Sequence, residues 1–281
     1  MKVLHTLLFL IFVSCARSPL KVYTSASKES VFHKDGLWKI SSEKVEILLE
    51  SQEELHVRAL LMCHEQKTDE ALSLIFENFK STSKDNEIYN IISVCHILNK
   101  DYEKALLAVE KGLALERKNK KLLLKLKHNK ALIFHKIGHF NEARTLYTEV
   151  LEKAPNLYTT SFNLGLLYLQ FNLTQEALAQ LEPLMNIAPK DIDLLSSIAL
   201  IHALEGRYNK ALSLFELIDM DSRQREDIAL YYAVSLVGAK RFEEAKVVLK
   251  NQNVPFIKEI RLMSRKLQDM VDTKLQTIAS K

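Results

Sequence analysis

Histidine is the residue type in this sequence that most invites a metal-binding or catalytic interpretation, because the chain carries nine of them. His56 and His64 are eight residues apart, and His128 and His135 are seven apart. On a helix each pair would share a face, but its members would lie about 10.5 to 12 Å apart along the axis, too far to bind one metal ion. No C-x-x-C motif or Cys/His ligand spacing occurs either. The sequence predicts neither a metal site nor a cofactor.

Nucleophilic and acid–base chemistry has no recognisable motif in this chain. A G-x-S-x-G elbow is absent, and the acidic residues are scattered rather than paired. We therefore predict that the protein is not an enzyme.

The cysteines Cys63 and Cys95 fall on predicted neighbouring helices. In an exported protein they could form a disulfide. They lie on slightly different parts of their helices, however, and disulfide geometry is demanding. Two separate buried thiols are the favoured prediction.

Cys15 follows the apolar run in "LLFLIFVSCA" near Lys2, a pattern typical of an export signal. The stretch "FVSC" resembles the lipobox of bacterial lipoproteins, which implies a signal peptide over 1–15 and lipidation of Cys15. Two alternatives remain open: cleavage after Ala16, which would discard the cysteine, and an uncleaved segment. In lipoproteins the following residue affects sorting, and Ala16 implies the periplasmic face of the outer membrane; the alternatives imply a periplasmic or secreted protein. Residues 16–40 would then form a tether, followed by a short leading helix over 41–51.

The composition favours a globular helical protein. The chain has 281 residues, of which 47% are hydrophobic and 26% charged, with only six glycines and five prolines. A net charge of +4 is too mild to predict nucleic-acid binding.

An internal repeat organises most of the chain. One alanine recurs in every unit with spacings of 34, 38, 34, 34 and 34 residues: Ala71, Ala105, Ala143, Ala177, Ala211 and Ala245. A small residue stands twelve positions before each alanine, and a bulky one stands four positions after it. The apolar residues within each unit recur with helical spacing, so each unit is predicted to be two antiparallel helices that stack on the next unit.

This pattern of small, small and bulky residues resembles the tetratricopeptide repeat (TPR) family. The resemblance implies an all-α TPR solenoid of about six units over 52–257, with approximate starts at 52, 86, 124, 158, 192 and 226. A C-terminal amphipathic capping helix is predicted over 258–281. Two irregularities stand out: four extra residues fall within "RKNKKLLLKLKHNK" between the second and third units, and Pro183 should kink the second helix of unit four.

In TPR proteins the first helix of each unit lines a groove that binds peptides or helices. The resemblance implies these groove positions: His56, Leu60, Asn90, Val94, His128, Leu132, His135, Phe162, Leu166, Leu169, Leu200, Leu204, Leu230 and Val234. Because many are apolar, they favour an amphipathic helix or an extended hydrophobic segment as partner. The lysine and asparagine pattern of chaperone-binding TPR domains is not matched at His56, Leu60 and Ile91. A basic stretch from Arg117 to Lys130 is a second candidate surface, although a solvated helix start is the favoured interpretation.

The predicted function is a scaffold or adaptor, lipid-anchored in the bacterial envelope, whose partners are other envelope proteins. Six repeats behind a lipobox resemble the pilotin lipoproteins of pilus assembly. A soluble periplasmic or secreted chaperone-like carrier and an adaptor for a cell-wall enzyme are the alternatives.

Overall fold

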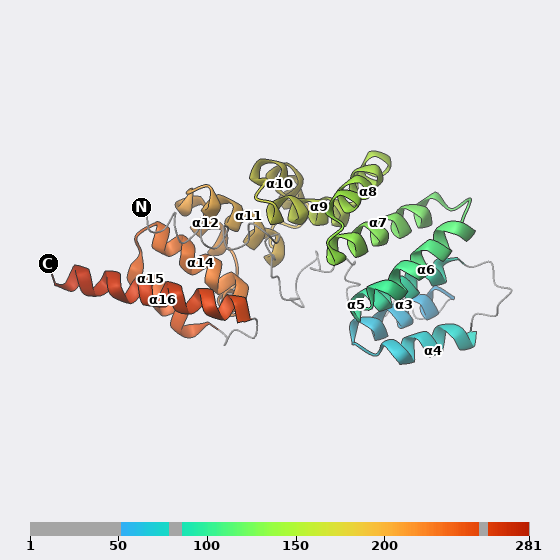
Figure 1. Ribbon diagram of the computed structural model, residues 1–281, viewed down its shortest axis with the longest axis horizontal. Coiled ribbons are helices and arrows are strands. Elements are labelled where there is room, and N and C mark those ends of the chain that lie inside the picture. The colour runs from blue at the N-terminus through green and yellow to red at the C-terminus, as the bar shows by residue number, and fades with distance from the viewer. Residues whose placement is uncertain (1–51, 79–85, 253–257, 281) are drawn as a thin grey trace. The chain divides into compact units, whose positions relative to one another are not determined.

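The computed structural model describes residues 52–78, 86–252 and 258–280, and every element in these ranges is a helix. Cys15, the tether over 16–40 and the leading helix over 41–51 lie outside the described residues. The elements are α3 (Gln52–His64), α4 (Thr68–Asn78), α5 (Glu87–Leu98), α6 (Tyr102–Leu115), α7 (Lys120–Ile137), α8 (Phe140–Lys153), α9 (Tyr158–Gln170), α10 (Thr174–Leu181), η1 (Glu182–Asn186), α11 (Ile192–Leu204), α12 (Tyr208–Phe215), α13 (Met220–Arg223), α14 (Glu226–Gly238), α15 (Phe242–Asn251) and α16 (Lys258–Ala279) (Figure 1).

The recurring alanines lie where two helices of a pair meet. All six are fully buried, from Ala71 to Ala245. The bulky residues four positions later are buried too, among them Tyr147 and Phe215, which have no exposed surface. The small residues let two helices approach closely and the bulky ones fill the space beside them, as the sequence predicts. The predicted all-α fold of six helix pairs followed by a capping helix is confirmed in the described residues.

The turn inside each pair closes in the same way. A residue with positive φ recurs with the period of the alanines: Gln66, Lys100, Gly138, Asn172, Gly206 and Lys240. The next N–H donates to the carbonyl five residues back, as from Lys67 to Met62 and from Asp101 to His96. This is the Schellman arrangement that ends many helices, and here four of its six left-handed positions are not glycine.

The chain divides into two compact units, which are described separately. The described part of the N-terminal unit runs from α3 through Leu167 within α9, and the C-terminal unit begins at Tyr168. In the N-terminal unit α5 packs on α3, α4, α6 and α7. In the C-terminal unit one core cluster joins residues of α11, α12, α14, α15 and α16.

The capping helix α16 packs on α14 and α15 through Ile260, Leu267 and Val271, which are buried. Met263, Met270 and Leu275 from the predicted stripe are partly buried against the same cluster. Ile278 is 57% exposed, so the buried stripe ends before the last turn.

The two irregularities have local structural effects. α10 ends at Leu181, and the residues around Pro183 form the 3-10 helix η1. Proline has no N–H to donate and clashes with the preceding turn, which accounts for the end of the α-helix there. The four extra residues extend α7, which has 18 residues where α5 has 12 and α11 has 13.

Candidate functional site

A groove of about 670 Å³ opens on the first helices of the N-terminal unit. Its lining residues come from α3, α5, α7 and the segment that joins α8 to α9 and starts α9: Leu60, His64, Glu87, Asn90, Val94, Lys121, Leu124, Lys125, His128, Asn129, Ala154, Asn156, Leu157 and Thr159. Three consecutive helix pairs and the start of the fourth therefore form one concave site.

Aliphatic side chains provide most of the groove's apolar surface. Leu60 comes from α3, Val94 from α5, Leu124 from α7 and Leu157 from the α8–α9 connection. Leu60, Leu124 and Leu157 are only partly buried, so they have surface left to cover. Burying such surface contributes about 25 cal/mol per Å².

A chain of hydrogen bonds connects α5 to α7 beside these leucines. The Lys125 ammonium lies 2.7 Å from Glu87 Oε1, and Asn90 Nδ2 donates to the same oxygen at 2.9 Å. Asn129 Nδ2 donates to Asn90 Oδ1 and to Ser93 Oγ, both at 2.9 Å. Asn90, Ser93 and Asn129 are at most 7% exposed. Because each buried amide has partners, the network fixes the positions of the polar groups at the groove.

The histidines of α7 are held by aromatic and polar neighbours. His128 Nδ1 is hydrogen-bonded to Thr160 Oγ1 of α9 at 2.9 Å, and its ring lies 5.9 Å from that of Tyr147. His135 packs edge-on against Tyr147 and Phe140. Burial raises the pKa of Tyr147 well above its usual value, which keeps the phenol neutral. No group of acidic, cysteine or histidine side chains in the described residues could hold a metal ion.

The start of α7 is firmly anchored. Asn119 caps the helix by accepting a hydrogen bond from the Leu122 N–H at 3.1 Å. Glu116 Oε1 accepts from the backbone N–H groups of Arg117, Lys118 and Asn119. Those bonds, the ones from residues 119 and 118 foremost, lower the pKa of Glu116 to about 2.

Part of the basic stretch is neutralised within the fold. Lys125 pairs with Glu87, Lys127 with Glu149 and Lys130 with Glu110. Lys121 is exposed and forms no ion pair with a described residue.

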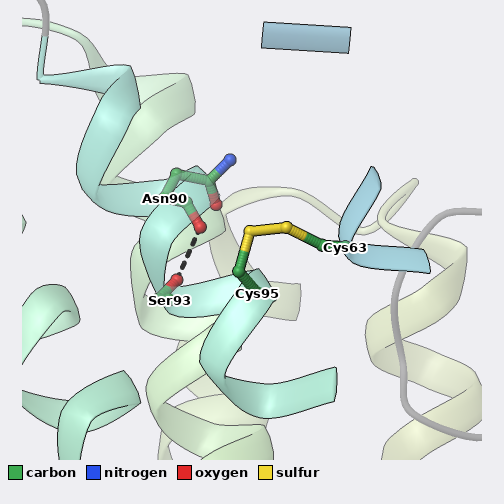
Figure 2. The surroundings of a disulfide bond; sticks show 4 residues. All are labelled: Cys63, Asn90, Ser93 and Cys95. Atoms are coloured by element: carbon green, nitrogen blue, oxygen red, sulfur yellow. Dashed lines mark hydrogen bonds between the residues drawn. A yellow bond between two sulfur atoms is a disulfide. The ribbon is translucent and has the colours of Figure 1, made fainter. Parts of the chain in front are cut away.

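A disulfide joins Cys63 of α3 to Cys95 of α5, with the Cα atoms 5.0 Å apart (Figure 2). The prediction of two separate thiols is therefore wrong. It assumed that matching positions of adjacent helices face each other, whereas the helices pack with an offset. Cys63 lies four residues after the buried Ala59, yet meets Cys95, which lies two residues after the buried Ser93. The bond ties together two helices that line the groove.

The sequence-predicted groove residues occupy different environments. Leu60, Asn90, Val94 and His128 line the groove. His56, His135 and Leu204 are partly buried. The others are buried, each at most 7% exposed: Leu132, Phe162, Leu166, Leu169, Leu200, Leu230 and Val234.

The predicted groove positions do not include several lining residues. Lys121 and Leu124 belong to the extra turn of α7, and the sequence signal for them is the four-residue irregularity in the repeat. Ala154, Asn156 and Leu157 flank the turn after α8, where the signal is Pro155. Asn129 lies one residue beyond a predicted position.

In the C-terminal unit the first helices bury a charged cluster. Arg225 Nη2 lies 2.6 Å from Asp193 Oδ1, and Arg225 Nε lies 2.8 Å from Asp227 Oδ1. Both aspartates are at most 1% exposed. Burial raises the pKa of Asp227, although the guanidinium opposes that shift. The cluster joins α11 to the start of α14.

Comparisons with known proteins agree with this architecture. No protein-family model matches the chain. A curated relative, "BBSome complex member BBS4" of Bos taurus, is 24% identical over 196 residues, which are 70% of this chain and 36% of the relative. The chain thus spans about a third of the length of that relative.

Two solved structures share the fold. A tetratricopeptide repeat protein from Parabacteroides merdae matches with a TM-score of 0.56 and 14% identity, over 81% of this chain and 86% of that one. YrrB, described as "a TPR protein with an unusual peptide-binding site", matches with a TM-score of 0.50 and 17% identity, over 69% of this chain and 97% of its own. The fold is that of a tetratricopeptide-repeat protein. Within the described residues, no helix is both long and apolar enough to span a bilayer.

Proposed function

We propose that this chain is a non-catalytic scaffold that binds a segment of another protein in the groove of its N-terminal unit. The observation that carries the proposal is the groove itself, in which partly buried leucines stand beside a fixed polar network. Protein–protein sites commonly combine an apolar centre with a few oriented polar groups. The similarity to a protein named as a member of a multiprotein complex supports a role in assembly.

Site-specific photocrosslinking tests this function and does not require the partner to be identified first. A photoreactive amino acid placed at Lys121, which lines the groove, should capture a discrete protein in the native host. The matched control is Leu107 of α6, which is 69% exposed and does not line the groove. The same reagent there should not capture that protein. Identical products from both positions, or none from position 121, would argue against the groove as the binding site.

We further propose that the scaffold is exported and anchored through a lipid on Cys15, at the periplasmic face of the outer membrane, where it would assemble other envelope proteins. The Cys63–Cys95 disulfide supports export, because disulfides persist in oxidising compartments and are rare in the cytosol. The resemblance of "FVSC" to a lipobox supports the anchor. Acyl chains contribute about 0.8 kcal/mol per buried methylene, so a multiply acylated cysteine would hold the protein on a membrane.

Metabolic labelling with palmitate tests the anchor. Wild-type protein should take up label and fractionate with membranes, whereas Cys15→Ala should do neither. If wild-type protein remains unlabelled, or the variant stays in the membrane fraction, the lipid anchor is wrong. A wild-type chain that begins after Ala16 in the periplasm would instead indicate a soluble carrier.

A further inference from the structure

The four extra residues between the second and third repeats build part of the groove. They lengthen α7 by about one turn at its N-terminus, so that the helix begins at Lys120. Lys121 and Leu124 lie three residues apart on this extension, hence on one face, and both line the groove. The insertion therefore adds one cation and one leucine to the site.

Lys121 gives this side of the groove an uncompensated positive charge. The second lysine of the lining, Lys125, lies 2.7 Å from Glu87, so that pair is neutral overall. The acidic residue nearest to Lys121 along the chain, Glu116, accepts three backbone N–H groups at the start of α7. No described carboxylate therefore pairs with Lys121, and a carboxylate from a partner would complement it.

The buried amides can bind a main chain. Asn90 Nδ2 donates one hydrogen to Glu87, which leaves a second N–H on that amide. Asn129 uses its amide hydrogens on Asn90 and Ser93, and its side-chain oxygen accepts from no described residue. One donor and one acceptor on adjacent helices match the C=O and N–H of an extended chain.

The size of the groove limits its occupant to a short segment. A volume of about 670 Å³ lies within the range of pockets that enclose a drug-sized ligand, about 300–1,000 Å³. A few residues fill such a space.

We propose that the groove binds an extended, internal segment of a partner protein in which a large apolar side chain stands next to an aspartate or glutamate. The apolar side chain packs against Leu60, Leu124 and Leu157, and the carboxylate pairs with Lys121. A single lysine favours a side-chain carboxylate over a chain terminus, whose two oxygens need more donors. This inference rests on the groove being the binding site proposed above.

Peptide selection followed by charge reversal tests the inference. The immobilised full chain is used to select from a phage-displayed library of random dodecapeptides joined to the coat protein by their C-termini, so that no free terminal carboxylate is present. Enriched sequences should pair a large apolar residue with a neighbouring Asp or Glu. No enrichment, or enriched peptides without an acidic residue, would overturn the proposal.

A fluorescein-labelled copy of the most enriched peptide, blocked at both ends, is then titrated by anisotropy. Lys121→Glu should weaken binding by about tenfold or more, the effect expected for a lost charge pair. Exchanging the peptide's acidic residue for lysine should restore binding to this variant. Lys118→Glu is the matched control: Lys118 lies in the same basic stretch, is exposed and does not line the groove, so affinity should change less than about twofold. Unchanged melting temperatures would show that both variants fold.

The failure of this inference can be told from failure of the proposed function. If Leu124→Asp and Leu157→Asp abolish peptide binding but Lys121→Glu does not change it, the groove binds segments and the acidic preference is wrong. If a peptide requires its own free C-terminus when retested in soluble form, the internal-segment proposal is wrong. If none of these three substitutions affects binding, both proposals fail.

Discussion

Buried polar residues in this helical protein fall into two groups that differ in how their hydrogen bonds are satisfied. Asn90, Ser93 and Asn129 bond to one another, and the Arg225 guanidinium lies between two buried aspartates. His202 is different: it is fully buried, and neither ring nitrogen has a hydrogen-bond partner among the described residues. An unpaired buried group of this kind is costly to charge.

The buried His202 should make stability depend on pH. Burial first, then the positive charges of Lys210 and Arg207, lower its pKa from 6.5 to about 4. Between these values the unfolded chain binds a proton that the folded chain does not. The free energy of unfolding should therefore fall as the pH falls from about 6.5 to 4, by about 3 kcal/mol from this residue.

Urea unfolding of the wild type and His202→Phe, measured at pH 7, 6, 5 and 4, checks this prediction. The variant keeps an aromatic ring of similar size but cannot take up a proton, so its stability should decline less over this range. Parallel pH profiles for the two proteins would contradict the assignment to His202.

Pairs of helices are the elements of this fold, and the disulfide crosses between two of them. Cys63 and Cys95 are separated by 32 residues and join the first helices of the first and second pairs. Leu60 and His64 of α3 and Val94 of α5 line the groove close in sequence to the bridged cysteines. The bond therefore limits how far these two sides of the groove can separate.

Removing the disulfide should destabilise the N-terminal unit. A crosslink across a loop of this length contributes about 2–4 kcal/mol by restricting the unfolded chain. Cys63→Ala with Cys95→Ala should lower the melting temperature in non-reducing buffer, and reduced wild-type protein should melt close to the variant. A double variant as stable as the oxidised wild type would show that the bond contributes nothing.

Much of the architecture was predictable because one periodic signal recurs in the chain. The alanines mark the closest contact within each helix pair, and geometry fixes the rest of a repeat around them. The groove was less predictable, because the extension of α7 brings in Lys121 and Leu124, which the regular pattern does not include. Many of the predicted leucines are buried instead, because adjacent first helices cover one another.

Contacts between repeats were the hardest part to predict. The disulfide depends on the offset between α3 and α5, and a helical repeat pattern does not specify that offset. Four turns place a non-glycine residue at positive φ, as at Lys100 and Asn172, where the sequence shows no glycine signal. Tertiary packing of the two helices on either side outweighs the local preference there.

For the molecule as a whole, we assign the binding of a protein segment to the N-terminal unit. Hydrogen–deuterium exchange of the full chain, alone and with the partner captured by crosslinking, tests this assignment most directly. We predict slower exchange in α5 and in residues 120–129 of α7 on binding, with unchanged exchange in α11, α12, α14 and α15. Protection confined to the C-terminal unit, with none in α5 or α7, would contradict the assignment.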